Sequence, residues 1–383
     1  MNIAFISNIR FPTEKAHGYQ IARVASALAE SGDVVTLYVP RRRNHLGTDW
    51  AAYYGVPSHF KVVRVPCIDF MMGNSLVDTL AFVVQMVTFA GSLFFVDIKR
   101  TTTIITRDKG LACFFGFRGF NVIYNAHSIK VSKLLAYTLS RVAGVVCNSV
   151  GTANAITELS AVPTMVIPNG SDMNPYVGVD VSVLRDELSL PQEKIIVLYS
   201  GHLYVWKGVD TIVGAAEKLA VDSRFLFVCV GGLPSDVSKY TALITKKGLS
   251  NIIFLGHREK TIIPKYLCAA TILLLPNSAK DEESRTQTSP LKLFEYLAAK
   301  GAIIASNLPS IASLVTEKEV LFVHPDDATD LAISLQYLLE HPTETYARRE
   351  QAYALSKEYT WEAHATKLRH FIEQIVTDTA GVV

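Results

Sequence analysis

Short runs of β-branched and other apolar residues alternate with helix-length stretches along almost the whole chain, and this alternation limits the fold more than any other feature. Parallel strands need a crossover connection, usually a helix, so the pattern is typical of a parallel sheet covered by helices. Seven such runs occur in the first half, near residues 3–7, 34–40, 61–66, 102–107, 122–127, 145–149 and 164–168. They predict one doubly wound α/β sheet.

The same pattern begins again in the second half of the chain. Six further runs start at Ile195, Phe225, Ile252, Thr271, Ala302 and Val320. Residues 171–194 separate the two patterns, and two prolines and a glycine there disfavour a continuous element. We therefore expect two Rossmann-like domains, over residues 1–170 and 195–357, joined by a linker. If two such sheets face each other, the strand ends line a cleft where helix N-termini suit diphosphates.

The end of the chain has the periodicity of a helix. Over residues 343–376 apolar residues recur at i, i+3 and i+4 spacing, most clearly in a stripe formed by Trp361, Ala365, Leu368, Phe371, Ile372 and Ile375. A helix with so apolar a face must pack against another element.

The overall charge excludes one broad class of partner. Lys+Arg total 37 and Asp+Glu total 35, a formal charge of +2, so no nucleic-acid partner is expected. The five cysteines lie far apart without a C-x-x-C pair, which is typical of reduced thiols. Met1 leads directly into an apolar run, without the basic segment of a secretory signal. We therefore expect a cytoplasmic protein.

Residues 76–96 form an almost uncharged stretch of about the length that spans a bilayer. Asp78 and Gln85 interrupt it, and the predicted strand at 102–107 follows closely. The interpretation we favour is a crossover helix that covers the sheet or lies on a membrane surface. A transmembrane span is the alternative.

The segment Ser289–Ala298 carries the strongest local signal. Ser289 is a good N-cap and Pro290 a good first helical residue, so a helix is expected to begin there. Glu295 lies about 1.7 turns further along, where one carboxylate can accept hydrogen bonds from both hydroxyls of a ribose. The alternative is a solvated glutamate, which is what helices usually carry.

The segment Tyr199–Gly208 joins the first strand of the second domain to its first helix. Gly201 permits close approach of a ligand to the backbone, and Lys207 adds a positive charge for a diphosphate near a helix start. The alternative is a surface lysine. The acidic cluster Asp281–Glu283 is interpreted as a solvated loop, and no metal site is expected.

These segments belong to a set of short motifs that together resemble one enzyme family. The set consists, in chain order, of Lys15–Gly18, Asn125–Ser128, Ile167–Gly170, Lys207–Gly208, Gly231–Gly232, Phe254–His257 and Pro290–Glu295. The order and content resemble the retaining GT-B glycosyltransferases of glycosyltransferase family four, over nearly the whole chain.

The resemblance implies a fold, a donor and a set of site residues. The fold is GT-B, with two Rossmann-like domains facing across a cleft and a C-terminal helix, about 358–383, that returns to the first domain. The donor is a GDP- or UDP-sugar, with no metal or other cofactor. His127 would contact the transferred sugar, Lys207 would neutralise the leaving diphosphate, and Glu295 would hold the ribose. The expected donor-binding residues are Gly18, in a loop that closes on the phosphates, with His202, Gly232, His257, Arg258, Gln287, Ser289 and Leu291.

Two positions depart from the family pattern. Gln287 replaces the usual first glutamate and cannot act as a carboxylate nucleophile, which favours a front-face mechanism in which the leaving diphosphate takes the acceptor proton. His202 stands where an arginine is usual. That change weakens phosphate binding unless His202 is protonated or Lys292 or Arg285 substitutes for it.

The acceptor side carries a second group of cations. Arg41, Arg42 and Arg43 follow the second predicted strand. Further cations nearby in sequence are Lys61, Arg64, Lys99, Arg100, Arg107 and Lys109. With the apolar helix 76–96 they are suited to an anionic membrane at the inner face or a lipid-linked acceptor, and the alternative is a solubilising surface.

The function expected from this resemblance is transfer of a sugar to a glycan or lipid-linked acceptor in surface polysaccharide or glycolipid synthesis. Two alternatives stay open: a catalytically weak nucleotide-sugar-binding partner subunit, and an epimerase or phosphorylase of similar shape. Turnover of a nucleotide sugar separates the first from a transferase.

Overall fold

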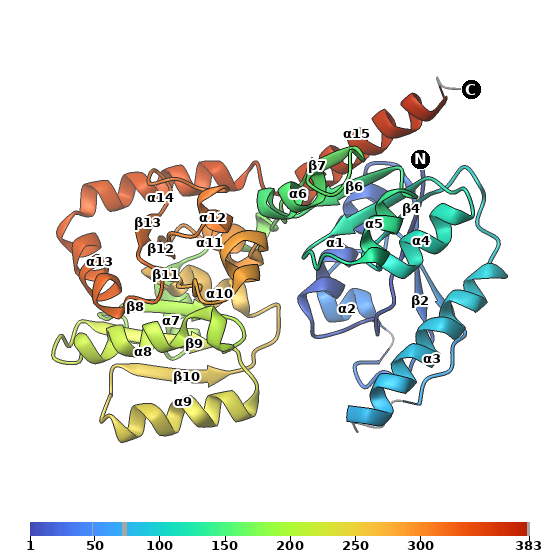
Figure 1. Cartoon of the computed structure of the whole chain (residues 1–383). Helices are drawn as coiled ribbons and strands as arrows, with labels where there is room; N and C mark the ends of the chain where they lie inside the picture. Colours follow the sequence, from blue (N-terminus) through green and yellow to red (C-terminus); the bar gives the residue numbers. More distant parts are fainter. Residues whose placement is uncertain (48, 71–74, 381–383) are drawn as a thin grey trace. The chain divides into compact units, whose positions relative to one another are not determined.

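The computed structural model describes residues 1–47, 49–70 and 75–380. By its backbone contacts the chain divides into two compact units. The first consists of the described residues of Met1–Asn148, Thr152–Ile167 and Trp361–Val383, and the second of Ser149–Gly151 and Pro168–Thr360. Each unit is an α/β domain with its own sheet (Figure 1).

The first unit is built on a seven-stranded parallel sheet in the order β3-β2-β1-β4-β5-β6-β7. Its strands are β1 (Asn2–Ile6), β2 (Val34–Pro40), β3 (Lys61–Val65), β4 (Thr103–Thr106), β5 (Val122–Ala126), β6 (Gly144–Cys147) and β7 (Thr164–Val166). Its helices are α1 (Ala16–Glu30), α2 (Trp50–Tyr54), α3 (Ser75–Phe94), α4 (Lys109–Phe117), α5 (Lys133–Leu139), α6 (Val150–Thr157) and α15 (Trp361–Ala380). The strand order reverses between β1 and β4, where doubly wound sheets bind ligands.

The second unit repeats this plan with six parallel strands in the order β10-β9-β8-β11-β12-β13. The strands are β8 (Ile195–Ser200), β9 (Phe225–Val230), β10 (Ile252–Gly256), β11 (Ile272–Leu275), β12 (Ala302–Ser306) and β13 (Leu321–Val323). The helices are α7 (Val181–Glu187), α8 (Val209–Lys218), α9 (Pro234–Lys246), α10 (Ile263–Ala269), α11 (Leu291–Ala298), α12 (Pro309–Ala312), α13 (Ala328–Glu340) and α14 (Pro342–Ser356), with the short turns η1 (Asn174–Tyr176), η2 (Val205–Lys207) and η3 (Glu283–Gln287). The prediction of two doubly wound sheets is confirmed, and the second sheet reverses between β8 and β11.

Residues 171–194, expected to form an irregular linker, are an ordered part of the second unit. Leu184 of α7 joins the hydrophobic core beneath the sheet. The guanidinium of buried Arg185 donates to the carbonyls of Ala269, Gln192 and Lys194 and to the hydroxyl of Thr271, at 2.6–3.1 Å. The prolines and the glycine flank a seven-residue helix here. They therefore interrupt no element.

Helix α15 buries its apolar stripe within the first unit. Trp361 and Leu368 are 2% and 1% exposed, and α15 packs along α1. The ring of Trp361 meets that of Tyr19 edge-on at 6.1 Å. The last part of the chain is therefore built into the first sheet's domain although it follows the second domain in sequence.

Helix α3 has one buried and one exposed apolar face. Ala81, Phe89 and Leu93 are fully buried against the first unit, and the amide of buried Gln85 donates to Asn8 at 2.8 Å. The opposite face remains apolar and exposed at Leu80, Phe82, Val83, Val87 and Phe94. Among the described residues, no helix has both the length and the apolar character needed to cross a membrane.

Candidate functional site

The turn between β8 and α8 places two glycines, Gly201 and Gly208, near the switch point of the second sheet. Gly201 has φ +140°, and Gly208 has φ +73°, both in regions that disfavour side chains. A Cβ at Gly208 would overlap the carbonyl of Pro276, and one at Gly201 would overlap the side chain of Lys292. Close packing against backbone requires glycine at Gly208, whereas at Gly201 the backbone conformation favours glycine and the end of the Lys292 side chain lies against it.

Lys207 lies at the end of η2, directly before α8. Its Nζ is 3.7 Å from the centroid of the Trp206 ring, a cation–π contact. Burial lowers the pKa of Lys207 to about 7, against the smaller opposing effect of Glu283 and Asp281. An ammonium group held in this way is poorly solvated and binds an anion more strongly than a surface lysine does.

Lys292, in the first turn of α11, lies at the same strand end. Its Nζ donates to the hydroxyl of Tyr199 at 2.8 Å and lies 4.0 Å from the centroid of that ring. Burial holds the pKa of Lys292 well below its usual value, and the charge of Lys207 adds to this effect. Among the described residues no carboxylate forms an ion pair with either lysine. Carboxylates act on the two lysines only without direct pairing: Glu283 and Asp281 on Lys207, and Glu295 on Lys292.

Glu295 lies on the next turn of α11 and is 9% exposed, so the alternative of a solvated glutamate is wrong. Its carboxylate forms an ion pair with Lys260, which follows β10. Glu295 also acts on the charge of Lys292. A buried carboxylate therefore lies beside the lysine pair, with one cation already bound to it.

Ser289 does not cap α11, contrary to expectation. The helix begins at Leu291, and no side chain caps it. The hydroxyl of Ser289 instead accepts a hydrogen bond from the backbone N–H of Asn169 at 3.1 Å, and the Asn169 amide donates to the Ser289 carbonyl at 2.7 Å. This longer-range pairing takes the place of an N-cap by Ser289 and holds the segment that leads into α11.

The segment before α11 contains a π-helical turn, η3, with Gln287 at its end. The backbone carbonyl of Gln287 accepts a hydrogen bond from the Ser149 hydroxyl at 3.0 Å. This bond anchors the backbone that carries the half-buried Gln287 side chain. Arg285 forms an exposed ion pair with Glu282. Within the described part of the chain, no group of three or more His, Cys, Asp or Glu side chains is arranged to hold a metal ion.

His202 follows Gly201 and is exposed. Its ring stacks on Tyr204 at 4.9 Å. Burial lowers the pKa of His202, and the charges of Lys292 and Lys207 lower it further. A histidine with a lowered pKa is neutral at pH 7, so it does not replace an arginine as a cation. Lys292 lies at the same strand end, and its own pKa is lowered by burial.

Two of the remaining expected donor residues of the second unit line one groove. Gly232 and His257 line an open hollow of about 860 Å³ beside α9. The guanidinium of Arg258 donates to the carbonyl of its neighbour His257 at 3.1 Å. Leu291 is half-buried at the start of α11. His257 is close enough to His202 to affect its pKa, which links the groove to the lysine pair.

In the first unit, Gly18 lies in the first turn of α1, where a flexible loop was expected. It is buried, and a Cβ would overlap the Tyr54 hydroxyl and the Thr13 side chain. Its N–H donates to the carbonyl of Lys15 at 3.1 Å. The Tyr54 hydroxyl is itself held by the backbone of Thr13. The packing alone thus explains a glycine at this position.

His127 follows β5 at the carboxyl edge of the first sheet. Burial lowers the pKa of His127 well below its usual value, and Arg107, His364 and His17 lower it further. The imidazole is therefore neutral and has one donor and one acceptor nitrogen for the hydroxyls of a sugar. Arg107 was expected only among the acceptor-side cations and His17 only within the Lys15–Gly18 motif, and nothing in the local sequence marks either as a neighbour of His127.

The part of the chain that carries the lysine pair and Glu295 has known relatives. Residues 180–355 match the family model described as glycosyl transferases group 1. Most of the second unit is thus similar to the group 1 glycosyltransferases. The match covers the two glycine turns, the lysine pair and Glu295.

Individual group 1 relatives are distant in sequence. The chain is 26% identical over 229 residues to a D-inositol 3-phosphate glycosyltransferase of Corynebacterium aurimucosum, covering 57% of this chain and 52% of the relative. It is also 26% identical over 225 residues to the putative colanic acid biosynthesis glycosyl transferase WcaI of Escherichia coli, covering 57% and 52%. The chain thus spans about half the length of the curated relatives it matches.

Solved structures extend the likeness to the whole chain at the level of fold. Sucrose-phosphate synthase from Thermosynechococcus elongatus superposes with a TM-score of 0.77 at 20% identity, covering 98% of this chain and 99% of that one. Anabaena HepE in complex with UDP gives 0.74 at 18% identity, covering 98% and 100%. The two Rossmann-like domains therefore have the GT-B fold expected from the sequence.

Proposed function

We propose that this protein is a retaining glycosyltransferase that moves a hexosyl group from a GDP- or UDP-sugar to a glycan or lipid-linked acceptor, in the synthesis of a surface polysaccharide or glycolipid. The observation that carries the proposal is the pair of desolvated lysines, Lys207 and Lys292, beside the buried carboxylate of Glu295. Two cations and one carboxylate at a sheet's switch point suit the diphosphate and the ribose of a nucleotide. The group 1 match over these residues supports the same donor class.

In the proposed reaction Lys207 and Lys292 stabilise the charge that develops on the leaving diphosphate. The anomeric C–O bond to the diphosphate breaks, the acceptor oxygen bonds to the anomeric carbon on the same face, and a diphosphate oxygen takes the acceptor proton. Gln287 cannot form a glycosyl ester as a carboxylate would, which favours this front-face route. His127 hydrogen-bonds the transferred sugar.

The donor-binding roles extend to the neighbouring residues. In this proposal Glu295 accepts from the ribose hydroxyls after leaving Lys260, and the base lies along the groove beside α9. The other donor contacts proposed are Gly18, His202, Gly232, His257, Arg258, Gln287, Ser289 and Leu291. HepE is described in complex with UDP and with UDP-glucose, so uridine donors are the first to test.

Thermal unfolding against a panel of nucleoside diphosphates tests the donor site. A ligand at 100 times its Kd adds about 2.7 kcal/mol to stability. One of UDP and GDP is expected to raise the Tm equally with and without EDTA. Glu295→Gln should abolish the shift, whereas Lys260→Gln, which breaks the same ion pair but keeps the carboxylate, should retain it. Loss in both variants, or no shift with any nucleotide, would count against ribose binding by Glu295.

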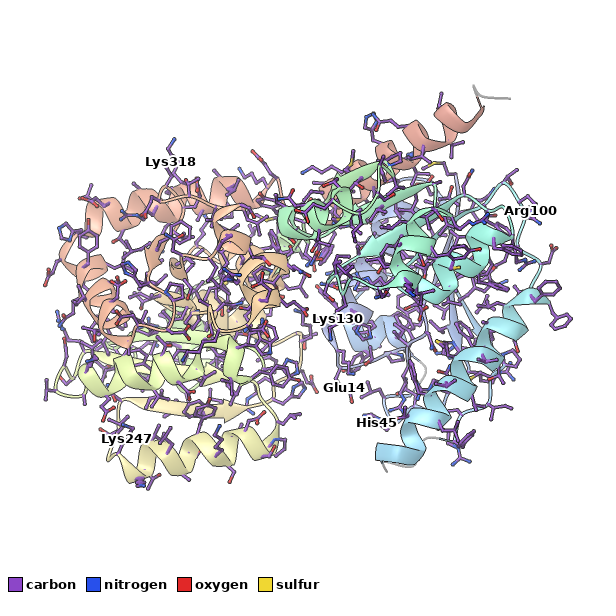
Figure 2. The ribbon with its side chains drawn as sticks, viewed as in Figure 1. Glu14, His45, Arg100, Lys130, Lys247 and Lys318 are labelled. Atoms are coloured by element: carbon purple, nitrogen blue, oxygen red, sulfur yellow. The ribbon has the colours of Figure 1, made fainter. Side chains whose placement is uncertain are left out.

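We further propose that the exposed face of α3 docks on an anionic membrane, at the inner face of which the protein would act. Phe94, Phe95 and Phe117 are 57%, 86% and 71% exposed near the end of α3. The Arg118 guanidinium lies 4.6 Å from the Phe94 ring, and Arg100 projects from the same unit (Figure 2). Apolar side chains mixed with cations suit an anionic bilayer surface.

The arginines after β2 provide the charge part of that test. Arg42 is paired with Asp69 at 3.3 Å, whereas Arg41 and Arg43 are exposed. Arg41→Ser with Arg43→Ser should weaken sedimentation with phosphatidylserine vesicles, and Lys318→Ser in the other unit should not. Unchanged sedimentation of the double variant would remove these arginines from the proposal.

A second candidate function is a nucleotide-sugar-binding subunit with little activity, which the neutral side chains of Gln287 and His202 favour. The two candidates differ in turnover. A transferase consumes the nucleotide sugar when the acceptor is present, whereas a binding subunit protects it under the same conditions. Release of nucleoside diphosphate, followed by chromatography, separates them.

A further inference from the structure

The turn between β8 and α8 carries two aromatic side chains, Tyr204 and Trp206, that the proposed donor contacts leave unused. They alternate with His202 along the chain, and the three rings form a row. The Tyr204 ring stacks on that of His202 with centroids 4.9 Å apart, and on that of Trp206 with centroids 6.2 Å apart. Lys207 ends the row, because its Nζ lies 3.7 Å from the centroid of the Trp206 ring. We call these three rings the aromatic row.

The backbone of the aromatic row is held at three points. The Tyr199 hydroxyl donates to the carbonyl of the histidine in the row at 2.6 Å. The Lys207 N–H donates to the Tyr204 carbonyl at 2.8 Å, and the Ser278 N–H donates to the Trp206 carbonyl at 3.0 Å. The rings therefore stand on an anchored turn.

Much of the surface at the aromatic row is exposed and apolar. Tyr204 is 42% exposed, Val205 64% and Leu233 51%. Leu233 follows Gly232, where a Cβ would overlap the Leu203 side chain, so the turn after β9 packs against the turn after β8. Aromatic and aliphatic side chains that gather in the open on anchored backbone are typical of a ligand site.

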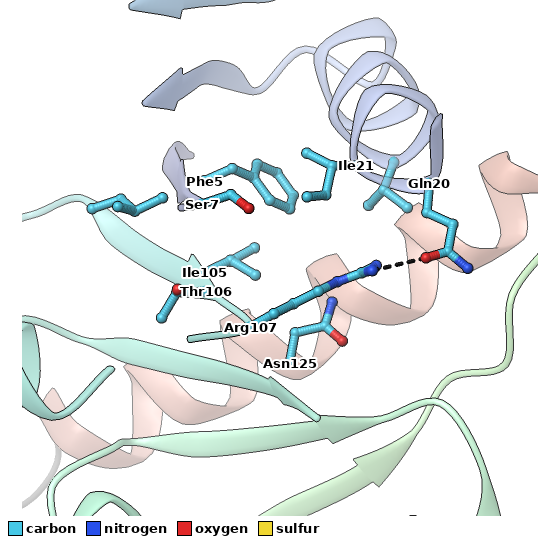
Figure 3. Close-up of a pocket in the computed structure, with 10 residues that line it drawn as sticks. Phe5, Ser7, Gln20, Ile21, Ile105, Thr106, Arg107 and Asn125 are labelled. Atoms are coloured by element: carbon cyan, nitrogen blue, oxygen red, sulfur yellow. Dashed lines mark hydrogen bonds between the residues drawn. The ribbon is translucent and has the colours of Figure 1, made fainter. Parts of the chain in front are cut away.

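The cavity at the switch point of the first sheet is too small for a sugar ring. It measures about 10 Å³, room for about one water. The Arg107 side chain lies across this pocket and donates to Gln20 at 2.8 Å (Figure 3). The aromatic row of the second unit, in contrast, is open to solvent.

The proposed front-face reaction limits where an acceptor lies. Its oxygen attacks on the face from which the diphosphate departs, and a diphosphate oxygen takes its proton, so the acceptor lies within hydrogen-bond reach of the diphosphate. Lys207 binds that diphosphate in the proposal, and the ring of Trp206 lies against the same ammonium group. The aromatic row therefore borders the place of the leaving group.

We propose that the aromatic row is an acceptor subsite, on which one pyranose ring of a neutral glycan packs with Tyr204 as its main contact. This inference rests on the proposed transferase function. One face of a pyranose ring presents apolar, weakly positive C–H groups, and the faces of aromatic rings are weakly negative. The lowered pKa of His202, caused by burial and the nearby lysines, keeps the row uncharged at pH 7.

Trp206 gives a direct readout in the full chain. It is half-buried, whereas Trp50 and Trp361, the other two tryptophans, are 8% and 2% exposed. Quenching of tryptophan fluorescence by acrylamide is measured with maltose, cellobiose, lactose and N,N′-diacetylchitobiose, each up to about 50 mM. At least one should protect the protein from quenching, and Trp206→Phe should abolish the protection. No protection by any of them, or equal protection by 1-hexanol, would overturn the sugar subsite.

Tyr204→Leu keeps an apolar side chain but removes the ring, and should weaken binding of the protecting disaccharide by about fivefold or more. Tyr346→Leu, a matched loss of a tyrosine that is 61% exposed in the same unit, should leave binding unchanged. An unaltered response in Tyr204→Leu would overturn the proposal. The Kd for UDP and GDP should stay within about threefold in this variant, and a larger loss would assign the row to the donor.

The same measurements separate the subsite from the transferase. If wild-type protein binds a nucleotide but no disaccharide, the subsite fails while the transferase proposal stands. If it binds a disaccharide at Trp206 but no nucleotide, the transferase proposal fails while the sugar site stands.

Discussion

At the switch point of the second sheet the cations are two lysines, whereas at that of the first sheet they are an arginine and histidines. Both sets lie where the strand order of a parallel sheet reverses, and neither is paired with a carboxylate among the described residues. If an anion binds at such a switch point, we expect the architecture to determine its place and the residue type to determine how binding depends on pH. A desolvated lysine loses its charge near neutrality, whereas arginine keeps it.

The largest expected effect is on turnover in the second unit. Lys207→Ala removes a cation from the developing charge of the leaving diphosphate and should lower kcat by about 10²–10³-fold. Lys318→Ala, at an exposed surface of the same unit (Figure 2), should leave kcat unchanged. Both are measured as release of nucleoside diphosphate from the donor identified by thermal stabilisation. A loss of less than fivefold in Lys207→Ala would mean that the lysine does not stabilise the leaving group.

The next effect concerns stability and compares a buried with an exposed arginine of the second unit. Arg185→Ala leaves the carbonyls of Ala269, Gln192 and Lys194 without their donor and should destabilise the protein by about 2–4 kcal/mol. Arg224→Ala removes an exposed pair with Asp222 and a contact with the Phe225 ring, and should leave the stability nearly unchanged. Urea unfolding measures both. Equal effects would mean that residues 171–194 are a linker after all.

This region also shows how far the sequence predicts the structure. The strands of the two sheets within the described residues were predicted because strands of covered parallel sheets are short, mostly apolar runs. Helix α7 was missed because its seven residues are too few to show a period. Ser289 was assigned as a cap from its local sequence, but the pairing with Asn169, 120 positions away, determines its role.

The candidate site was predictable to a similar extent. Lys207 and Glu295 stand out because each lies at a fixed place in a strand-to-helix connection, and the structure brings both to one strand end. Lys260 could not be predicted from the sequence, because its ion pair with Glu295 forms only when the loop after β10 folds against α11. Arg107 was one of several cations on the first half of the chain. Its burial beside Gln20 depends on the packing of β4 against α1.

A third effect tests the contrast between lysine and arginine directly. Because the pKa of Lys207 is about 7 without ligand, a diphosphate that binds the protonated form should bind about tenfold more weakly for each pH unit above 7. Calorimetry in two buffers of different ionisation enthalpy should detect proton uptake on binding at pH 7.5. Lys207→Arg should reduce both the uptake and the pH slope. A slope that is the same in this variant would assign the titration to another group.

The same lowered pKa predicts how stability changes with pH in the absence of ligand. Unfolded lysine holds its proton up to about pH 10.4, whereas folded Lys207 loses it near 7. Between these values the unfolded state binds more protons, so this group makes the protein more stable as pH rises from 7 towards 10. The pH dependence of the Tm in wild type and Lys207→Met isolates its contribution. No difference between the two slopes would mean that the lysine is solvated in solution.

The smallest effect on stability is expected at the exposed face of α3, where the two sides of one helix can be compared. Val87→Ser alters a side chain that is 60% exposed and should change the free energy of unfolding by about 0.5 kcal/mol or less. Thr88→Ser, one position along, keeps the hydroxyl that donates to Val84 and serves as the matched control. If Val87 is solvated, the substitution removes no packing contact. If Val87 docks on a membrane, it removes an apolar contact with the lipid. Vesicle sedimentation should therefore weaken several-fold in Val87→Ser and not in Thr88→Ser. A marked loss of stability without any loss of sedimentation would mean that this face is covered by protein.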